Sequence, residues 1–242
     1  MNTLFGPGGP VSPPGDVALD CAAAALMAYH APPTWSAEGC EALAVDIPNP
    51  IHGHLFGVSF RGTNDLADAG VDLWAFPRRH PKLGWVHTGF ARGADAVYPK
   101  IVADLPDKRV PLCYDGHSKG GPEAIFNAAR ACLDGYNVKY LIVFNPPRCT
   151  MGTRVLEILA AHGVIMQRVV ARGDPFSHLP PFALGYSHFI DATYAGQGWD
   201  IAPDHPMKST YFDMLIERQQ RKLLSLAQVA HNRAWAEACV QE

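Results

Sequence analysis

The chain has 242 residues, of which 48% are hydrophobic and 18% are charged, and its formal net charge is -3. This length and composition are typical of one globular domain with a full hydrophobic core. The slight negative charge and the lack of a long lysine and arginine run argue against a phosphate-tracking surface. We therefore expect no nucleic-acid partner.

Residues 1–15 contain four prolines among several glycines, which predicts an extended arm, and residues 16–242 are predicted to form a single domain. The N-terminal segment has neither the basic region nor the apolar region of a signal peptide, so we expect a cytoplasmic protein unless an unusual route exports it. The six cysteines are scattered without a C-x-x-C pair, and we expect most of them to be reduced and buried.

Apolar periodicity and turn residues predict an alternation of helices and strands along the domain. In chain order, we expect a helix over 16–29, a strand over 55–60, a short helix over 64–74, a loop over 75–85, a helix over 89–105, a strand over 110–114, a helix over 122–133, a strand over 138–144, a helix over 152–162, a strand over 164–171 and a long helix over 209–238. The apolar strands predict an α/β fold, in which a mostly parallel central sheet carries helices on both faces.

The segment Gly116-His117-Ser118-Lys119-Gly120 has the pattern G-x-S-x-G between a predicted strand and a predicted helix. In a sharp strand-to-helix turn this pattern exposes the serine hydroxyl, and the backbone N–H of the next residue faces the substrate oxyanion. The bare pattern also fits a flexible glycine turn, but its position favours Ser118 as a nucleophile and Lys119 as an oxyanion donor.

A nucleophilic serine needs a base and an acid that orients the base. Asp174 follows the predicted strand that ends near residue 171, and parallel strands share one carboxyl edge, so Ser118 and Asp174 are expected at the same rim. This placement makes Asp174 the candidate acid, although Asp174-Pro175 is also a common turn sequence.

Four histidines follow Asp174, and His205 is the best candidate for the base because it lies in a loop just before the last predicted helix. His188, among apolar neighbours, is the alternative. His178 is only four residues from Asp174, and His231 lies inside a predicted helix. His52 and His54 are two residues apart, but without a third ligand nearby we expect no metal site.

Several segments resemble the fungal-type, or class 3, lipases over more than half of the chain. The similar segments are 58–63, 86–90, 116–121, 144–148, 174–181 and 205–211. The resemblance implies an α/β-hydrolase fold and a serine hydrolase that cleaves carboxylic esters, often of lipids, through an acyl-enzyme and without a cofactor. It also implies Thr63 as the second oxyanion donor and residues 64–74 as a lid.

Two features depart from the family pattern. Lys119 stands where an apolar residue is usual, and a cation there favours an anionic or short polar substrate. The lid segment carries Asp65, Asp68 and Asp72, which suit a lipid surface poorly. We expect a small-molecule or lipid ester substrate and at most transient contact with a lipid interface through the lid. A thioesterase, amidase or acyltransferase on the same triad, or a non-catalytic binding protein of the same fold, are the alternatives.

Overall fold

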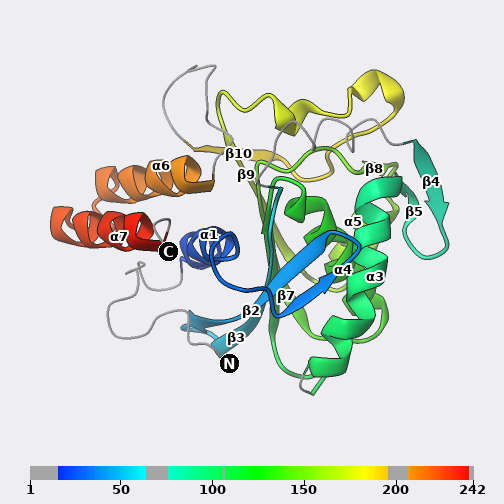
Figure 1. Cartoon of the computed structure of the whole chain (residues 1–242), viewed down its shortest axis with the longest axis horizontal. Helices are drawn as coiled ribbons and strands as arrows, with labels where there is room; N and C mark the ends of the chain where they lie inside the picture. Colours follow the sequence, from blue (N-terminus) through cyan, green and yellow to red (C-terminus); the bar gives the residue numbers. More distant parts are fainter. Residues whose placement is uncertain (1–15, 64–75, 106, 196–206, 240–242) are drawn as a thin grey trace.

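The computed structural model describes residues 16–63, 76–105, 107–195 and 207–239. Within these residues, a twisted sheet has the strand order β1-β2-β3-β6-β7-β9-β10 (Figure 1). From β3 to β10 each strand runs parallel to its neighbour, whereas β1 and β2 form an antiparallel edge. The strands are β1 (Trp35–Ala37), β2 (Cys40–Asn49), β3 (Gly53–Phe60), β6 (Leu112–His117), β7 (Val138–Phe144), β9 (Ile165–Ala171) and β10 (Ala192–Ala195).

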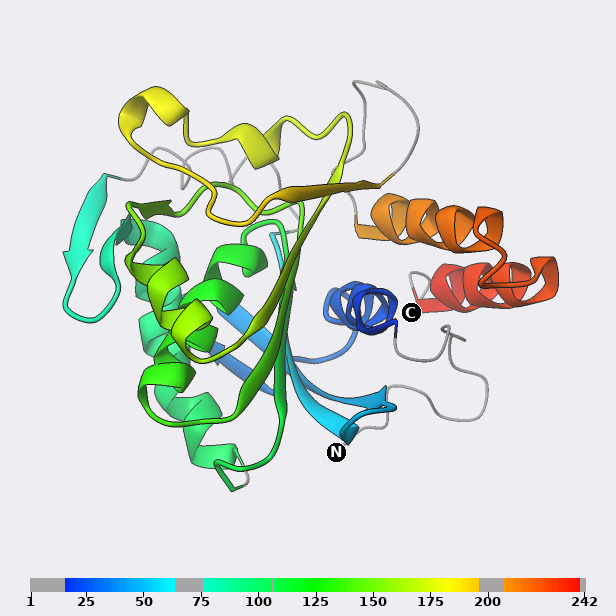
Figure 2. The same cartoon turned by 180° about the vertical axis from the view of Figure 1, so that it is seen from behind.

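Helices cover both faces of this sheet, as Figure 1 and the reverse view in Figure 2 show. One face packs against α1 (Val17–Met27), α6 (Met207–Gln220) and α7 (Leu226–Cys239), and the other against α3 (Thr88–Asp104), α4 (Gly120–Leu133) and α5 (Arg154–Ala161). Alternate residues of β6 supply the two cores: Cys113 points to the α1 face, and Leu112 and Tyr114 point to the α4 face. This is the mostly parallel sheet with helices on both faces that the strand pattern predicted.

A hairpin replaces the loop that was predicted over 75–85. Strands β4 (Pro77–His80) and β5 (Gly84–His87) pair antiparallel, and β5 also pairs with β8 (Thr150–Met151). The prediction was wrong because the prolines were taken to exclude strands. Pro77 instead begins β4, and Pro81 lies in the turn, where a missing N–H interrupts no ladder.

The long C-terminal helix predicted over 209–238 is two helices. Lys222 has a positive φ of 58° in the turn between α6 and α7, which ends the first helix. The second helix begins with a reciprocal cap, in which the Ser225 N–H donates to the Gln228 side chain and the Gln228 N–H donates to the Ser225 hydroxyl.

The antiparallel pair of strands β1 and β2 was also missing from the prediction.

The other predicted elements that lie within the described residues are confirmed to within a few residues, and β7 has its predicted bounds. Asp16 caps α1, because its side chain accepts a hydrogen bond from the Leu19 N–H at 3.1 Å. Five of the six cysteines are buried. The predicted arm over 1–15, the predicted lid over 64–74 and His205 lie outside the described residues. Among the described helices, none is both long and apolar enough to cross a membrane.

Candidate active site

Ser118 lies in the turn between β6 and α4, and its backbone has a positive φ of 52°. A non-glycine residue in this region costs about 1–3 kcal/mol and persists only where the surrounding structure holds it. The Ser118 N–H donates to the carbonyl of Phe144 at the end of β7, at 2.9 Å, which ties the strained residue to the carboxyl edge of the sheet. This geometry is that of a nucleophile elbow.

The glycines around Ser118 are required by close approach of the backbone. A Cβ atom on Gly116 would lie 2.3 Å from the carbonyl oxygen of Gly120. A Cβ atom on Gly120 would lie 2.3 Å from the carbonyl oxygen of Phe60, at the end of β3. Because both neighbours are backbone atoms, neither clash is relieved by a side-chain movement. The G-x-S-x-G pattern is therefore a structural requirement of this turn.

The loop after β3 packs directly against the nucleophile. A Cβ atom on Gly62 would lie 3.1 Å from the Ser118 Cβ and 2.8 Å from the His117 carbonyl oxygen, so only glycine fits there. Thr63 is the next residue and is half-buried. The sequence-predicted oxyanion residues Thr63 and Lys119 thus flank Ser118 from two directions, the first from this loop and the second from the start of α4.

Tyr29, just after α1, connects the loop after β3 with the turn that carries Ser118. Its hydroxyl lies 2.6 Å from Nδ1 of His117 and also forms a hydrogen bond with the backbone of Gly62. Burial raises the pKa of the Tyr29 phenol well above its usual value, so the hydroxyl is neutral and can donate. Tyr29 was not identified from the sequence, because its partner His117 is 88 positions away and no local pattern joins them.

The Lys119 ammonium has two partners within the protein. Its Nζ donates to the Gly39 carbonyl at 2.5 Å and lies 3.7 Å from a carboxylate oxygen of Glu123. The Glu123 side chain is only 1% exposed, so it faces this cation with little solvent screening. These partners argue against the expectation that Lys119 presents a substrate-selecting cation beside Ser118, which stays a prediction to be tested.

Asp174 lies in the loop that follows β9, at the same edge of the sheet as Ser118. The residue is buried, its N–H donates to the Ala171 carbonyl at 3.1 Å, and its Oδ1 accepts a hydrogen bond from the Phe176 N–H at 2.9 Å. The last contact is the turn geometry that an Asp-Pro sequence favours. A carboxylate that only shaped a turn would ordinarily face solvent, and its burial favours the role of an orienting acid.

The described histidines after Asp174 do not supply an evident base. Nε2 of His188 lies 2.7 Å from the Ser177 carbonyl, so in the neutral ring this nitrogen is the donor. Burial lowers the pKa of His188 to about 4. His178 and His231 are exposed. His205 belongs to the segment that precedes Met207, the first residue of α6.

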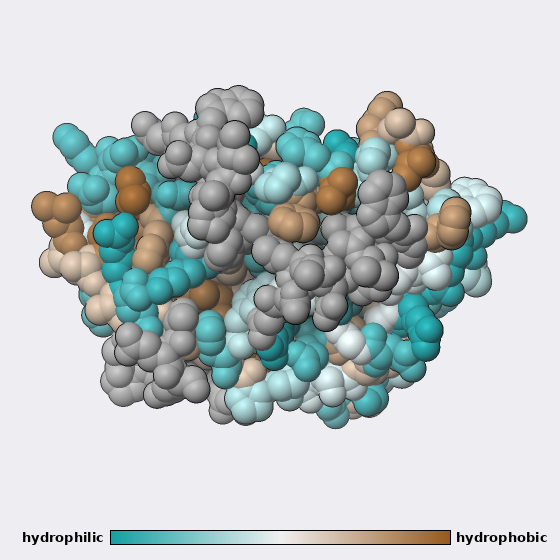
Figure 3. Space-filling view, turned by 45° about the horizontal axis from the view of Figure 1, so that its top comes forward, coloured by the Kyte–Doolittle hydropathy of each residue, from teal (hydrophilic) through white to brown (hydrophobic). Residues whose placement is uncertain are grey.

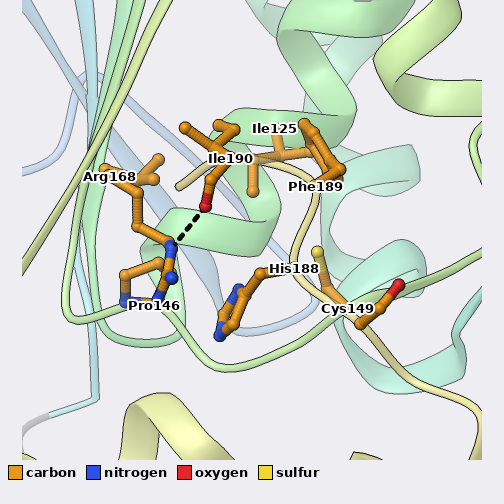
Figure 4. A pocket seen from close by; sticks show the side chains of 9 residues that line it. Ile125, Pro146, Cys149, Arg168, His188, Phe189 and Ile190 are labelled. Carbon is orange, nitrogen blue, oxygen red and sulfur yellow. Dashed lines mark hydrogen bonds between the residues drawn. The ribbon is translucent and has the colours of Figure 1, made fainter. Parts of the chain in front are cut away.

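His188 instead lines a small pocket together with Arg168 and Ile190 (Figure 4). The Arg168 Nε donates to the Ile190 carbonyl at 2.9 Å across this pocket. The other lining residues are Ile125, Val143, Pro146, Cys149, Ser187 and Phe189. Neither Ser118 nor Asp174 lines it, so this pocket is separate from the candidate triad.

The remaining histidines considered in the sequence are His52 and His54. His54 lies 3.1 Å from Asp46, and neither His52 nor His54 belongs to a group of metal-ligating side chains within the described residues.

Comparison with known proteins places these features in a family. Residues 57–184, more than half of the chain, match the family model described as lipase (class 3). A curated lipase of Rhizomucor miehei is 26% identical over 159 residues, which cover 62% of this chain and 42% of that protein. The chain thus spans less than half the length of this curated relative.

Solved structures of fungal lipases share the fold. A Rhizomucor miehei lipase in complex with its propeptide superposes with a TM-score of 0.57 at 23% identity, covering 70% of this chain and 56% of that chain. Another fungal lipase gives a TM-score of 0.60 at 20% identity, covering 76% and 80% of the two chains. These structures show the α/β-hydrolase fold, and the family match over 57–184 shows that the chain belongs to the class 3 lipase family.

Proposed function

We propose that this protein is a serine hydrolase that cleaves carboxylic esters through an acyl-enzyme intermediate. The observation that carries the proposal is the conformation of Ser118, whose positive φ of 52° is held between the end of β6 and the start of α4. Backbone strain of this kind is kept where function requires it. Membership of the class 3 lipase family and the curated Rhizomucor miehei lipase support ester hydrolysis as the reaction.

In the proposed reaction, the Ser118 Oγ attacks the ester carbonyl carbon while His205 takes its proton. Asp174 holds the imidazole in the required tautomer and stabilises the imidazolium. The tetrahedral intermediate collapses when His205 donates that proton to the departing alcohol oxygen. Water then attacks the acyl-enzyme with the same base, and the carboxylic acid leaves Ser118 as a free hydroxyl.

The negative charge that develops on the carbonyl oxygen is held by the backbone N–H groups of Thr63 and Lys119. The close approach of Gly62 to the Ser118 Cβ supports the first donor, and the position of Lys119 at the start of α4 supports the second. One such donor contributes about 3 kcal/mol to lowering the barrier in other hydrolases. No step requires a cofactor.

The preferred substrate is a soluble or micellar ester of short to medium chain length. Exposed apolar side chains interrupt the polar surface over the segment that contains the 3₁₀ helix η2 (Phe182–Leu184), and Phe182 and Leu184 are 71% and 52% exposed (Figure 3). Such side chains suit transient contact with a micelle. The three aspartates of 64–74 oppose insertion into an anionic lipid surface.

Labelling with an active-site phosphonate, followed by peptide mass spectrometry, tests the nucleophile directly. We expect a single adduct on Ser118 in the intact protein and none in Ser118→Ala, together with hydrolysis of a panel of p-nitrophenyl esters of rising chain length. A folded protein that neither reacts with phosphonate nor hydrolyses any ester of the panel would overturn the proposal. Added alcohol as a competing nucleophile distinguishes a hydrolase from an acyltransferase.

Rates measured through the solubility limit of one ester test the substrate class. We expect the rate to level off near that limit. A sharp rise once an oil interface forms would instead identify an enzyme that is activated at lipid surfaces, which contradicts the preference for soluble and micellar esters.

A further inference from the structure

Two buried cysteines meet where α1 packs against the sheet (Figure 1). Cys21 lies in the second turn of α1, Cys113 is the second residue of β6, and their Sγ atoms are 3.3 Å apart. Both side chains are fully buried, and the two residues are 92 positions apart in the chain. The fold therefore brings together two thiols that no local sequence pattern connects.

The composition of α1 allows this close approach. Residues 22–25, which follow Cys21, are all alanine and all buried. Small side chains at a contact shorten the distance between packed elements. The sulfurs of a disulfide are about 2.0 Å apart, so the two thiols need to approach by only about 1.3 Å to form one.

The other cysteines lie elsewhere in the fold. Three of them belong to the core on the opposite face of the sheet: Cys40, Cys132 and Cys149. Cys239 is the last residue of α7 and is partly exposed. Cys21 and Cys113 both belong to the core under α1. Their contact is thus specific to one place in the fold and does not come from a cysteine-rich region.

We propose that Cys21 and Cys113 form a disulfide that cross-links α1 to β6 when the chain folds in the presence of a low-molecular-mass disulfide, such as oxidised glutathione. The thiolate of one cysteine attacks a sulfur of that oxidant and releases one thiol. The second cysteine then displaces the remaining thiol from the mixed disulfide. In total the two cysteines give up two protons and two electrons, which the two released thiols carry away. The bond is independent of the proposed ester hydrolysis, because neither cysteine takes part in that reaction.

The bond closes before α1 has docked on the sheet. In the folded, reduced protein, burial raises the pKa of the Cys113 thiol. Burial, the neighbouring Cys113 and the carboxyl group of Asp115 raise the pKa of the Cys21 thiol well above its usual value. Because the thiolate is the attacking species, both docked thiols are poor nucleophiles, and their burial also keeps the oxidant out. The same burial protects the bond from reductants once it has formed.

A zinc ion is the alternative occupant of this cluster. Asp115, which lies on the same face of β6 as Cys113, offers a carboxylate oxygen within 4.8 Å of both Sγ atoms. Two thiolates on one tetrahedral zinc ion lie about 3.8 Å apart, because each Zn–S distance is about 2.3 Å. The observed 3.3 Å is shorter, and the hydroxyl of Ser59 already donates to Oδ1 of Asp115 at 2.5 Å. A thiol pair fits these contacts better than a metal centre.

The cross-link acts on stability and not on the chemistry at Ser118. It closes a loop between residues 92 positions apart, which restricts the unfolded chain far more than the folded one. Cys113 is five residues before Ser118, which places it about 16 Å away along the strand. The oxidised protein should therefore unfold at a higher temperature than the reduced protein.

Counting free thiols tests the bond on the full chain. The protein is purified without reductant, and a second preparation is unfolded, reduced and refolded in a buffer of reduced and oxidised glutathione. Each is then denatured and alkylated without prior reduction, and the intact mass gives the number of alkylated cysteines. Cys21→Ala and Cys113→Ala remove one partner each. Cys239→Ala is the matched control, because it removes a cysteine from the same side of the sheet and leaves the pair intact.

We expect four of the six wild-type cysteines to be alkylated in at least one preparation, and peptide mapping to find Cys21 bonded to Cys113. All five remaining cysteines should be alkylated in Cys21→Ala and in Cys113→Ala, but only three of the five in Cys239→Ala. Six alkylated cysteines in both wild-type preparations would overturn the proposal. A bond to another cysteine, a lasting mixed disulfide with glutathione, or one tightly held zinc ion per chain after incubation with zinc chloride would overturn it as well.

Thermal unfolding tests the stabilising role. The wild type with the bond should unfold about 5–15 °C above the same protein refolded in dithiothreitol. Cys21→Ala should show no difference between the two conditions, and Cys239→Ala should show the full difference. A bond that forms without raising the midpoint of unfolding would contradict the role of this disulfide as a stabilising cross-link.

Discussion

The Tyr29 hydroxyl lies 2.6 Å from Nδ1 of His117, and the backbone of Gly62 bonds to the same hydroxyl. His117 precedes the proposed nucleophile Ser118, and Gly62 precedes the proposed oxyanion donor Thr63. A single phenol therefore joins the side chain of one of these neighbouring residues to the backbone of the other. Tyr29 is supplied by the segment after α1, outside the residues that match the family model.

Tyr29→Phe should lower kcat/KM about 10- to 100-fold, because losing the hydroxyl lets the two backbone segments drift from the geometry that stabilises the oxyanion. The measurement is steady-state hydrolysis of a soluble ester. Tyr98→Phe is the matched control, since it removes a phenol hydrogen bond of 2.7 Å to Asp134 far from Ser118. Equal activity of the two variants would contradict this role of Tyr29.

Replacing Ser118 separates stability from turnover. Ser118→Gly should raise the free energy of unfolding by about 1 kcal/mol, because glycine adopts φ of 52° without the strain that serine carries. Ser118→Ala should not gain this stability, since alanine keeps a Cβ atom. Both variants should lose about a million-fold in turnover, by analogy with a serine protease of another fold whose nucleophile is removed. Denaturant unfolding and ester hydrolysis measure the two effects, and ester turnover that survives in either variant would exclude Ser118 as the nucleophile.

Asp174→Ala and His205→Ala should each cripple catalysis, and combining either with Ser118→Ala should add little, because the three groups act as a unit. His188→Ala should retain most of the activity, since its Nε2 is engaged with the Ser177 carbonyl. Steady-state kinetics of the single and double variants provide the check. An inactive His188→Ala beside an active His205→Ala would reverse the assignment of the base.

Lys119→Met should destabilise the protein by about 3–5 kcal/mol, because it takes the cation away from the buried carboxylate of Glu123. Adding Glu123→Gln should restore part of that loss. The ratio of rates on anionic and neutral esters should stay the same, since the ammonium is bound to the Gly39 carbonyl and lies 3.7 Å from Glu123. Arg92→Met is the control, because its exposed pair with Glu38 is worth at most about 1 kcal/mol. A changed ratio of rates on anionic and neutral esters in Lys119→Met would show that Lys119 does take part in substrate selection.

The buried Asp115 predicts a pH dependence of stability. Burial raises the pKa of Asp115 well above its usual value, despite the hydrogen bond of 2.5 Å that Ser59 donates to it. The folded state therefore keeps a proton that the unfolded chain releases above about pH 4, so stability falls as the pH rises from there to the pKa in the folded state. Asp115→Asn should flatten this fall in urea unfolding at a series of pH values. Asp107→Asn, at an exposed position, should leave this fall in stability unchanged. If the fall persists in Asp115→Asn, another titrating group causes it.

The parts of the fold that local sequence determines were predictable. The apolar run of β7 and the glycines around Ser118 define their local structure, so the strand and the strand-to-helix turn were predicted. Asp174 was placed at the same sheet edge because it follows another parallel strand. The break before α7 has only a weak local signal, the Ser225 and Gln228 pair, because Lys222 is not a residue that normally marks a turn. The roles of Tyr29 and Cys21 depend on partners 88 and 92 positions away, which no local pattern reveals.

One layer of the molecule consists of α1 together with α6 and α7, and the contact from Arg218 to Asp16 joins residues 202 positions apart. During synthesis, α1 and the strands on which it packs, β2, β3, β6 and β7, therefore leave the ribosome well before α6 and α7. Until then the side of α1 that these two helices cover in the folded protein stays open. Nascent chains that stall before α6 should thus be captured by chaperones or aggregate, and activity should appear only after the last two helices emerge.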